Sequence, residues 1–167
     1  QHSIVVTTDV IGNITYVNQK FCEISAYPQQ HLLGKNTRLL NSGVHPQSFF
    51  SDMYNNLASG EVWRGEICNK ARDGRLYWLL TTIIPFMDKM GKPVQYIAIC
   101  TDITERKATE NQLRKLSLAV EQSSESIVIT NLAGDIEYVN EAFVHHTGYS
   151  REEALGKNPR ILYSEKT

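Results

Sequence analysis

The chain contains two copies of one sequence pattern, and their spacing is the strongest constraint on its architecture. The segment from Gly12 to Ser42 aligns with the segment from Gly134 to Ser164, with identical residues at 14 of 31 positions. The copies lie about 122 residues apart. That is the size of a domain and far longer than the roughly 20–50 residues of a solenoid or propeller repeat. We therefore expect two related domains in tandem.

The repeat predicts a nearly complete first domain, a linker helix and a truncated second domain, at residues 1–104, 105–123 and 124–167. The linker carries Leu113, Leu116 and Val120 at i, i+3 and i+7, the spacing of a short apolar seam on a helix. The first residues show neither a start Met nor the organisation of a signal peptide. We therefore expect a piece of a longer protein.

Strand and helix patterns in the first copy predict an α+β fold. Two short β-rich segments, 3–8 and 13–17, precede Asn18, which is a suitable N-cap for a helix. Helices are expected over 19–26, 29–33 and the segment between Pro46 and Gly60, and long strands over 62–71, 75–87 and 93–103. Because the long strands are joined by short turns, they should pair as an antiparallel meander. We predict a five-stranded antiparallel sheet with small helices on one face.

Charge and composition exclude several functional classes. Lys and Arg number 17 against 18 Asp and Glu, so the net charge of -1 lacks the basic excess that favours nucleic-acid binding. No run of 18 apolar residues occurs, so we expect no membrane span. The three Cys residues are too widely spaced for a zinc site and are expected to be free thiols in the cytoplasm. Common catalytic motifs do not occur, so we expect no enzyme activity in this segment.

Four motifs in the chain resemble the PAS family of sensory domains. They are Gly12-Asn13-Ile14-Thr15-Tyr16-Val17-Asn18 with Phe21, Leu33-Gly34-Lys35-Asn36, Asn69-Lys70-Ala71-Arg72-Asp73-Gly74 and Thr101-Asp102-Ile103-Thr104-Glu105. The resemblance covers about residues 3–105 and, in the second copy, 126–167. It implies the PAS fold in both copies, joined by the linker helix. The fold alone does not specify a ligand, because PAS domains host many.

A narrower resemblance is carried by the segments 41–53 and 63–69. They are similar to the flavin-binding redox PAS domains of aerotaxis receptors, nitrogen-fixation regulators and the sensor kinase of methane monooxygenase regulation. Those domains bind FAD without covalent attachment, so FAD is the cofactor that this resemblance implies. The implied function is sensing of redox state or oxygen, with relay through the linker helix and the second domain to an effector in the same chain. The expected effector is a histidine kinase of a two-component system.

Alternation along the strand 62–71 supports a site for a flat ring. By the strand period of two, Trp63, Gly65, Ile67 and Asn69 share one face. They offer a large ring, a gap without a side chain, an aliphatic wall and an amide that both donates and accepts hydrogen bonds. This set suits a flat heteroaromatic ring lying on the sheet. A core strand with one hydrogen-bonded Asn explains the same pattern, so both interpretations stay open.

The residues depart from the LOV type of flavin PAS domain, which senses blue light. LOV photochemistry needs a Cys in a motif like Gly-Lys-Asn-Cys-Arg, and Thr37 stands at that place here. Two further flavin contacts of LOV domains also differ, because Leu79 stands where an Asn is expected and Cys100 where a Gln is expected. We therefore expect no LOV photochemistry. Redox chemistry needs no such Cys, because the flavin carries it.

Two arginines are candidates for the phosphates of the cofactor. Arg38 is favoured because LOV domains use the matching Arg on phosphate, whereas Arg64 falls on the other face of its strand. His45 precedes the third helix, where it either lines the opening of the cofactor site or caps the helix. The candidate cofactor-binding residues are thus Trp63, Asn69, Arg38, Ile67, Gly65, His45, Thr37, Leu79 and Cys100. No set of metal ligands is expected.

The opposite face of the long strands is unusually apolar for a surface in contact with solvent. If Asn69 faces inward, alternation places four large side chains outward: Trp78, Leu80, Ile97 and Ile99. Such a patch indicates a partner that covers it. PAS domains commonly dimerise or dock a flanking helix on this face, so the resemblance implies a homodimer through the outer sheet face and the flanking helices.

Two alternatives to the redox sensor stay open. The first is a PAS pair without a cofactor that acts as a dimerisation and signal-relay module. The second is a blue-light sensor with chemistry different from that of LOV domains. The colour of the purified protein and its light-minus-dark spectrum would separate these readings.

Overall fold

The computed structural model describes residues 3–163, and the chain divides between Lys107 and Ala108 into two compact units. The domain limits expected at 104/105 and 123/124 stay a prediction. The end of the second copy, from position 164 on, lies outside the described residues. Within residues 3–163, no helix has both the length and the apolar composition that crossing a membrane requires.

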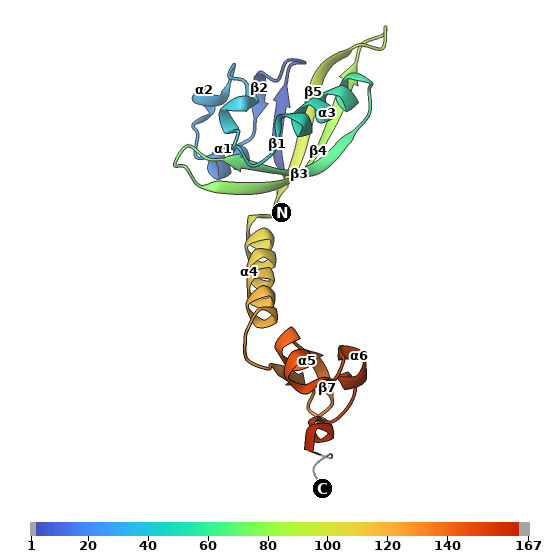
Figure 1. The fold of residues 1–167 in the computed structure, drawn as a ribbon. Helices are drawn as coiled ribbons and strands as arrows, with labels where there is room; N and C mark the ends of the chain where they lie inside the picture. Colours follow the sequence, from blue (N-terminus) through green and yellow to red (C-terminus); the bar gives the residue numbers. More distant parts are fainter. Residues whose placement is uncertain (1–2, 164–167) are drawn as a thin grey trace. The chain divides into compact units, whose positions relative to one another are not determined.

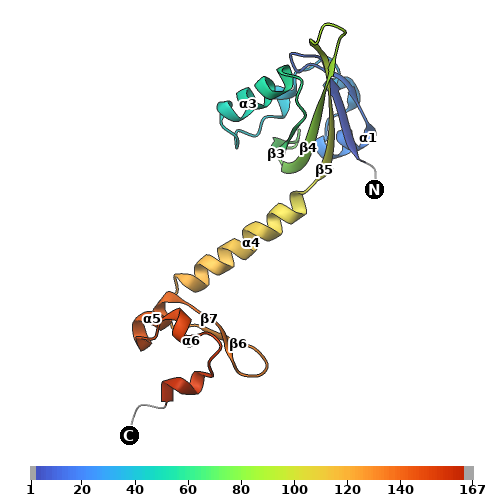
Figure 2. The same ribbon diagram turned by 90° about the vertical axis from the view of Figure 1, so that its right-hand side faces the viewer.

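The first unit is built on a five-stranded antiparallel sheet, which confirms the predicted fold class. Its strands are β1 (Ile4–Thr8), β2 (Ile14–Val17), β3 (Trp63–Lys70), β4 (Leu76–Met87) and β5 (Pro93–Asp102). They lie in the order β2-β1-β5-β4-β3, so β3 forms one edge of the sheet. Figure 1 shows this sheet, and Figure 2 shows the long strands β4 and β5 side by side.

Four short helical segments connect β2 to β3. They are α1 (Gln19–Ser25), α2 (Gln29–Leu32), the 3-10 helix η1 (Thr37–Leu40) and α3 (Gln47–Ala58). The Asn18 side chain accepts a hydrogen bond from the backbone N–H of Phe21, so the predicted N-cap of α1 is confirmed. Helix α3 packs against β3 and β4 (Figure 1). The sequence patterns did not predict η1.

The core of the first unit lies between the sheet and these helices. Cross-strand pairs such as Ile67 with Leu79 and Thr81 with Cys100 place the buried residues of β4 and β5, together with Ile67 of β3, on one face. We call this the inner face. Leu80 and Ile99 belong to the opposite, outer face and are 43% and 42% exposed. Trp78, Ile97, Thr82 and Ile84 lie on the outer face as well and are half-buried.

Helix α4 (Thr104–Glu121) follows β5 directly, as expected for the linker segment. The Asp102 carboxylate accepts hydrogen bonds from the backbone N–H and the hydroxyl of Thr104, and the Thr104 hydroxyl accepts one from the N–H of Trp78. One turn later, Lys107 pairs with Glu66 of β3, and its ammonium lies 4.9 Å from the centre of the Trp78 ring. Both strands β3 and β4 therefore contact the first turn of α4.

The second unit repeats the first elements of the first. It contains β6 (Val128–Thr130), β7 (Ile136–Val139), α5 (Glu141–Thr147), α6 (Arg151–Ala154) and the 3-10 helix η2 (Pro159–Tyr163). Strands β6 and β7 pair in antiparallel fashion, as β1 and β2 do. Asn140 caps α5 through the N–H of Phe143, which matches the cap of α1 by Asn18. The repeat in sequence is thus a repeat in structure.

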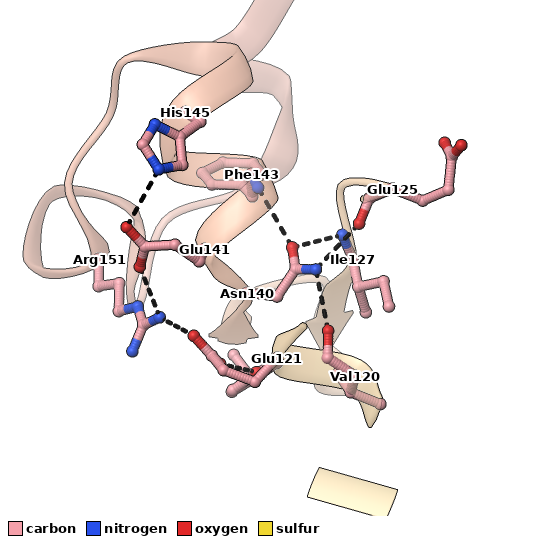
Figure 3. Close-up of polar contacts among 10 residues, drawn as sticks. Val120, Glu121, Glu125, Ile127, Asn140, Glu141, Phe143, His145 and Arg151 are labelled. Carbon is pink, nitrogen blue, oxygen red and sulfur yellow. Dashed lines mark hydrogen bonds and ion pairs between the residues drawn. The ribbon is translucent and has the colours of Figure 1, made fainter. Parts of the chain in front are cut away.

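Asn140 also ties the end of α4 to the rest of the second unit (Figure 3). Its Oδ1 accepts from the N–H of Ile127, and its Nδ2 donates to the backbone carbonyls of Val120 and Glu125. The side chain is 0% exposed, so these bonds satisfy a polar group that would otherwise be costly to bury. The equivalent Nδ2 of Asn18 donates to one carbonyl, that of Ser3.

A second contact at this junction is electrostatic. Glu121, the last residue of α4, pairs with Arg151 of α6, and Arg151 also pairs with Glu141 at 3.0 Å (Figure 3). The hydroxyl of Tyr138 donates to the same Glu121 carboxylate and holds its pKa below the usual range. The last turn of α4 is therefore held to the rest of the second unit by both hydrogen bonds and charge.

Candidate functional site

A cavity of about 660 Å³ lies between the inner face of the sheet and the segment from η1 to α3. Its size falls within the range of ~300–1,000 Å³ that is typical of small-molecule sites. The walls come from β1, β3, β4, β5, α1, η1 and α3. Most of the deep wall is apolar and is made by Val6, Phe21, Leu40, Phe50, Met53, Leu57, Ile67, Leu79, Ile83 and Ala98. Many residues of the hydrophobic core thus also line the cavity.

Seven of the nine predicted cofactor-binding residues line this cavity. They are Thr37, Arg38, His45, Ile67, Asn69, Leu79 and Cys100. These residues come from η1, the loop before α3, and three different strands, so the fold brings together positions far apart in the chain. Trp63 and Gly65 lie on the inner face of β3 but are not among the lining residues.

The Trp63 indole lies across the backbone of Gly65. A Cβ atom added to Gly65 would overlap Cη2 and Cζ2 of the ring. The missing side chain at Gly65, interpreted from the sequence as a gap for a ligand ring, therefore accommodates Trp63 in this structure. The ring also meets Phe49 edge to face, with centroids 5.6 Å apart. A direct role for Trp63 and Gly65 in cofactor binding stays a prediction.

His45 lies beside the free edge of β3. Its Nε2 accepts a hydrogen bond of 2.9 Å from the backbone N–H of Cys68. The Ser42 hydroxyl donates to the carbonyl of the same Cys68 at 2.6 Å, so the segment before α3 covers the edge strand. Burial lowers the pKa of His45, which favours the neutral ring that can accept this bond. His45 does not cap α3, since no side chain caps that helix.

Asn69 lines the cavity, and its nearest neighbour across the sheet is Tyr77. Tyr77 is 0% exposed, and its hydroxyl has no hydrogen-bond partner among the described residues. Burial raises the pKa of Tyr77, and the nearby Asn69 amide opposes this rise without meeting hydrogen-bond geometry. An unpaired buried hydroxyl costs about 1–3 kcal/mol. Beside the cavity residue Asn69 there is thus a buried hydroxyl whose hydrogen-bonding capacity is not used.

Cys100 and Thr81 form a second polar pair on the inner face. The Thr81 hydroxyl donates to the Cys100 sulfur at 3.5 Å, and both residues line the cavity. Burial raises the pKa of Cys100 to about 11, so its thiol is protonated at neutral pH. Thr81 was not among the predicted site residues. Strand alternation from Leu79 would have found it, because residues two apart share a face.

Arg38 is the one formally charged side chain among the residues that line the cavity, and neither Asp nor Glu contributes to its wall. It lies on η1, where Asn36 caps the helix through the N–H of Arg38. Arg64, the other arginine considered, pairs with Thr82 on the outer face. The cavity therefore carries positive charge on one side only, which favours a ligand with an anionic group.

A polar row on α3 also lines the cavity and was not predicted. Gln47, Ser51 and Asn55 follow one another at intervals of four residues, so they project from the same side of the helix. Their spacing is visible in the sequence beside the apolar stripe of Met53 and Leu57. Together with Arg38, they make a polar region in a cavity that is otherwise mostly apolar.

The lining suits a ligand with three parts. The apolar inner face accommodates a flat body, Asn69 offers a donor and an acceptor to a polar edge, and Arg38 offers a cation to an anionic tail. A flavin dinucleotide has these parts.

Comparisons with known proteins match both copies of the repeat. The family model described as PAS domain matches residues 1–105, and that described as PAS fold matches residues 114–167. The nitrogen fixation regulatory protein of Klebsiella pneumoniae is 34% identical over 134 residues, which cover 80% of this chain and 26% of that protein. The aerotaxis receptor of Escherichia coli is 33% identical over 101 residues, which cover 60% of this chain and 20% of the receptor.

The fold also matches solved structures. An RNA-binding light-oxygen-voltage receptor superposes with a TM-score of 0.61 and 25% sequence identity, over 70% of this chain and 34% of that chain. The chain spans about a third of the length of that receptor, 26% of the nitrogen fixation protein and 20% of the aerotaxis receptor.

Proposed function

The chain belongs to the PAS family of sensory domains, and we propose that its first unit binds FAD non-covalently and reports redox state or oxygen. The observation that carries this proposal is the cavity of about 660 Å³, with apolar walls, the Asn69 amide and a single cation at Arg38. The resemblance to redox PAS domains, stated from the motifs, supports FAD as the ligand.

In this proposal the residues of the cavity hold the cofactor and control its surroundings. The apolar inner face excludes water from the ring, and Asn69 exchanges hydrogen bonds with the polar edge of the ring. Arg38 neutralises part of the diphosphate charge, and the polar row of α3 meets the sugar and phosphate groups. Bound FAD supplies reversible uptake of two electrons with protons from a cellular reductant, which dioxygen reverses.

The signal leaves the first unit through the strands that form the cavity. Asn69 and Glu66 belong to the same strand, and Glu66 pairs with Arg106 and Lys107 at the start of α4. A change in hydrogen bonding at Asn69 can thus alter the position of α4 and the units that follow. We infer that the effector is a histidine kinase in the same chain and that the outer face, with Trp78, forms a homodimer.

An absorption spectrum before and after anaerobic reduction tests the proposal. We expect the two visible bands of oxidised flavin, their loss on reduction and their return in air, with FAD released on heating. Asn69→Ala should weaken FAD binding, whereas Lys70→Ala, on the other face of the same strand, should not. A colourless protein that does not take up added FAD would exclude this function.

A cofactor-free relay module is the second candidate. It is favoured by the position of Trp63, which already covers Gly65 with a side chain of the protein itself. Here Asn69 and Arg38 have no ligand to bind, and α4 alone connects the two units. The spectrum described above separates the two functions, because only the first gives a coloured protein.

A further inference from the structure

The hydroxyl of Tyr77 is buried in the first unit without a hydrogen-bond partner among the described residues. Its side chain is 0% exposed, and no described residue forms a hydrogen bond with its oxygen. A buried polar group of this kind is unusual, since nearly all such groups in folded proteins are paired. Replacing it by Phe would remove the mismatch, so its presence calls for an explanation beyond packing.

Tyr77 of β4 pairs with Asn69 of β3 across the sheet. Of the two residues, only Asn69 lines the cavity. The backbone of Asn69 is held on both sides, by the ladder to Tyr77 and by a bridge to Asn41. Rotation of the side chain is therefore the freedom that Asn69 retains, and Tyr77 is positioned to limit it.

We propose that Tyr77 is a positioning residue that determines which end of the Asn69 amide faces the ligand. A phenol both donates and accepts hydrogen bonds. When Tyr77 donates to Oδ1 of Asn69, the amide presents its NH₂ group to the cavity as a donor. When Nδ2 of Asn69 donates to the Tyr77 oxygen, the amide presents Oδ1 as an acceptor. Rotation of the hydroxyl allows either arrangement without leaving Asn69 unpaired.

This inference rests on the proposed function and adds how the site responds to the protonation state of its ligand. A flavin ring that gains a proton on reduction turns an acceptor into a donor at its polar edge. The Asn69 amide can rotate to match that change, because the Tyr77 hydroxyl can pair with either end of the amide. With Phe at position 77, the amide lacks this partner in both arrangements. Tyr77 thus couples the state of the ligand to the inner face of β3 and β4.

The test is a double-mutant cycle read by binding affinity, with riboflavin as the probe. Riboflavin contains the flavin ring without the phosphates, so Arg38 contributes little to its binding. Tyr77→Phe, Asn69→Ala and the double variant are titrated with riboflavin by fluorescence quenching, after removal of bound flavin. We expect Tyr77→Phe to weaken binding about tenfold, and to have no further effect when Asn69 is already Ala.

Thermal unfolding of the same variants without flavin gives a readout that does not depend on binding. The bond between Tyr77 and Asn69 is proposed for the flavin-bound protein, whereas without flavin the Tyr77 hydroxyl has no partner among the described residues. Tyr77→Phe should therefore raise the midpoint of unfolding of the flavin-free protein or leave it unchanged. Tyr16→Phe, at a 50% exposed position on β2, serves as the control and should change neither quantity. A lowered midpoint for Tyr77→Phe would show that the hydroxyl has a structural role instead, and would overturn the proposal.

The outcomes separate the two proposals. Suppose that the protein binds riboflavin, and that Tyr77→Phe has the same effect on binding, or no effect, in the unsubstituted protein and in the Asn69→Ala variant. Tyr77 then does not act through Asn69, and the flavin function stands. If the unsubstituted protein binds neither riboflavin nor FAD, then the flavin function fails and the role of Tyr77 fails with it.

Discussion

Nε2 of His45 accepts a hydrogen bond of 2.9 Å from the backbone N–H of Cys68, so a loop side chain closes the free edge of the sheet. The bond requires an unprotonated Nε2, and the neighbouring Phe49 ring stacks on the imidazole with centroids 4.2 Å apart. Protonation of His45 would therefore break the contact that joins the loop before α3 to β3.

Stability should consequently fall in mild acid because of His45. Its pKa is lowered by burial in the folded state, so the folded protein binds fewer protons than the unfolded chain near pH 6. The contribution of His45 to the free energy of unfolding is fully present above its pKa in the unfolded chain, about 6.5. This contribution is lost as the pH falls through that value towards the lower pKa of His45 in the folded protein. His45→Gln should flatten the dependence of the unfolding midpoint on pH between about 7.5 and 5.5.

His31→Gln is the matched control for this measurement, because His31 is exposed on α2. The groups facing His45 are the rings of Phe49, Phe50 and Trp78, with the Lys107 ammonium on the Trp78 ring. An unchanged pH dependence in His45→Gln would contradict the assignment of the effect to this ring.

Gly65→Ala should displace the Trp63 indole. A methyl group at this position would overlap the ring, so the change should destabilise the first unit by about 1–3 kcal/mol, as overpacking does in cores. The chain has two Trp residues, so the Trp78→Phe background leaves Trp63 as the one fluorophore of its kind. Emission should shift to longer wavelength as the ring becomes hydrated. Lys70→Ala, at an exposed position of β3, should leave the emission unchanged.

Arg38→Ala should weaken FAD binding by about tenfold and leave riboflavin binding nearly unchanged. The reason is that riboflavin lacks the diphosphate that Arg38 is proposed to contact. Arg64→Ala is the control, because Arg64 lies on the outer face opposite the cavity. Calorimetric titration of the three proteins with both ligands measures the difference. Equal loss for FAD and riboflavin would place Arg38 near the ring instead of the phosphates.

Glu66→Gln should loosen the first turn of α4. Lys107 and Arg106 hold the pKa of Glu66 below its usual range, so the ion pairs stabilise the fold above the unfolded pKa and weaken as the pH falls through the folded value. Hydrogen exchange at residues 104–107 should become faster, and added salt should have the same effect on the unsubstituted protein. Glu61→Gln, at an exposed position before β3, should leave this exchange unchanged.

Local patterns in the sequence predict most elements of the first unit. Asn18 caps α1 as expected, and the period of two along β3 places Ile67 and Asn69 on the inner face. These features depend on residues close to one another in the chain, so propensity and spacing are sufficient to find them. The internal repeat likewise predicts that the second unit begins with the same strands and capped helix.

The contacts that define the site depend on residues far apart in the chain. His45 meets Cys68 across 23 positions, and no local pattern indicates that its ring closes a sheet edge. The gap at Gly65 is filled by Trp63 because the two share a face and the ring turns along the strand. The unpaired hydroxyl of Tyr77 emerges only after packing is known. Side-chain direction and tertiary neighbours decide these features, and spacing does not encode them.

The amide of Asn140 spans a junction, since it bonds both to the capped helix α5 and to the carbonyl of Val120 in the preceding helix. A receptor engineer who fuses this second unit to another input should therefore cut upstream of Val120 and not at the first strand. A cut at Val128 would remove the carbonyls of Val120 and Glu125, and would leave the buried NH₂ group of Asn140 unpaired. Chimeras that keep the last turn of α4 with the strands and helices it contacts would retain the hydrogen bonds that connect α4 to them.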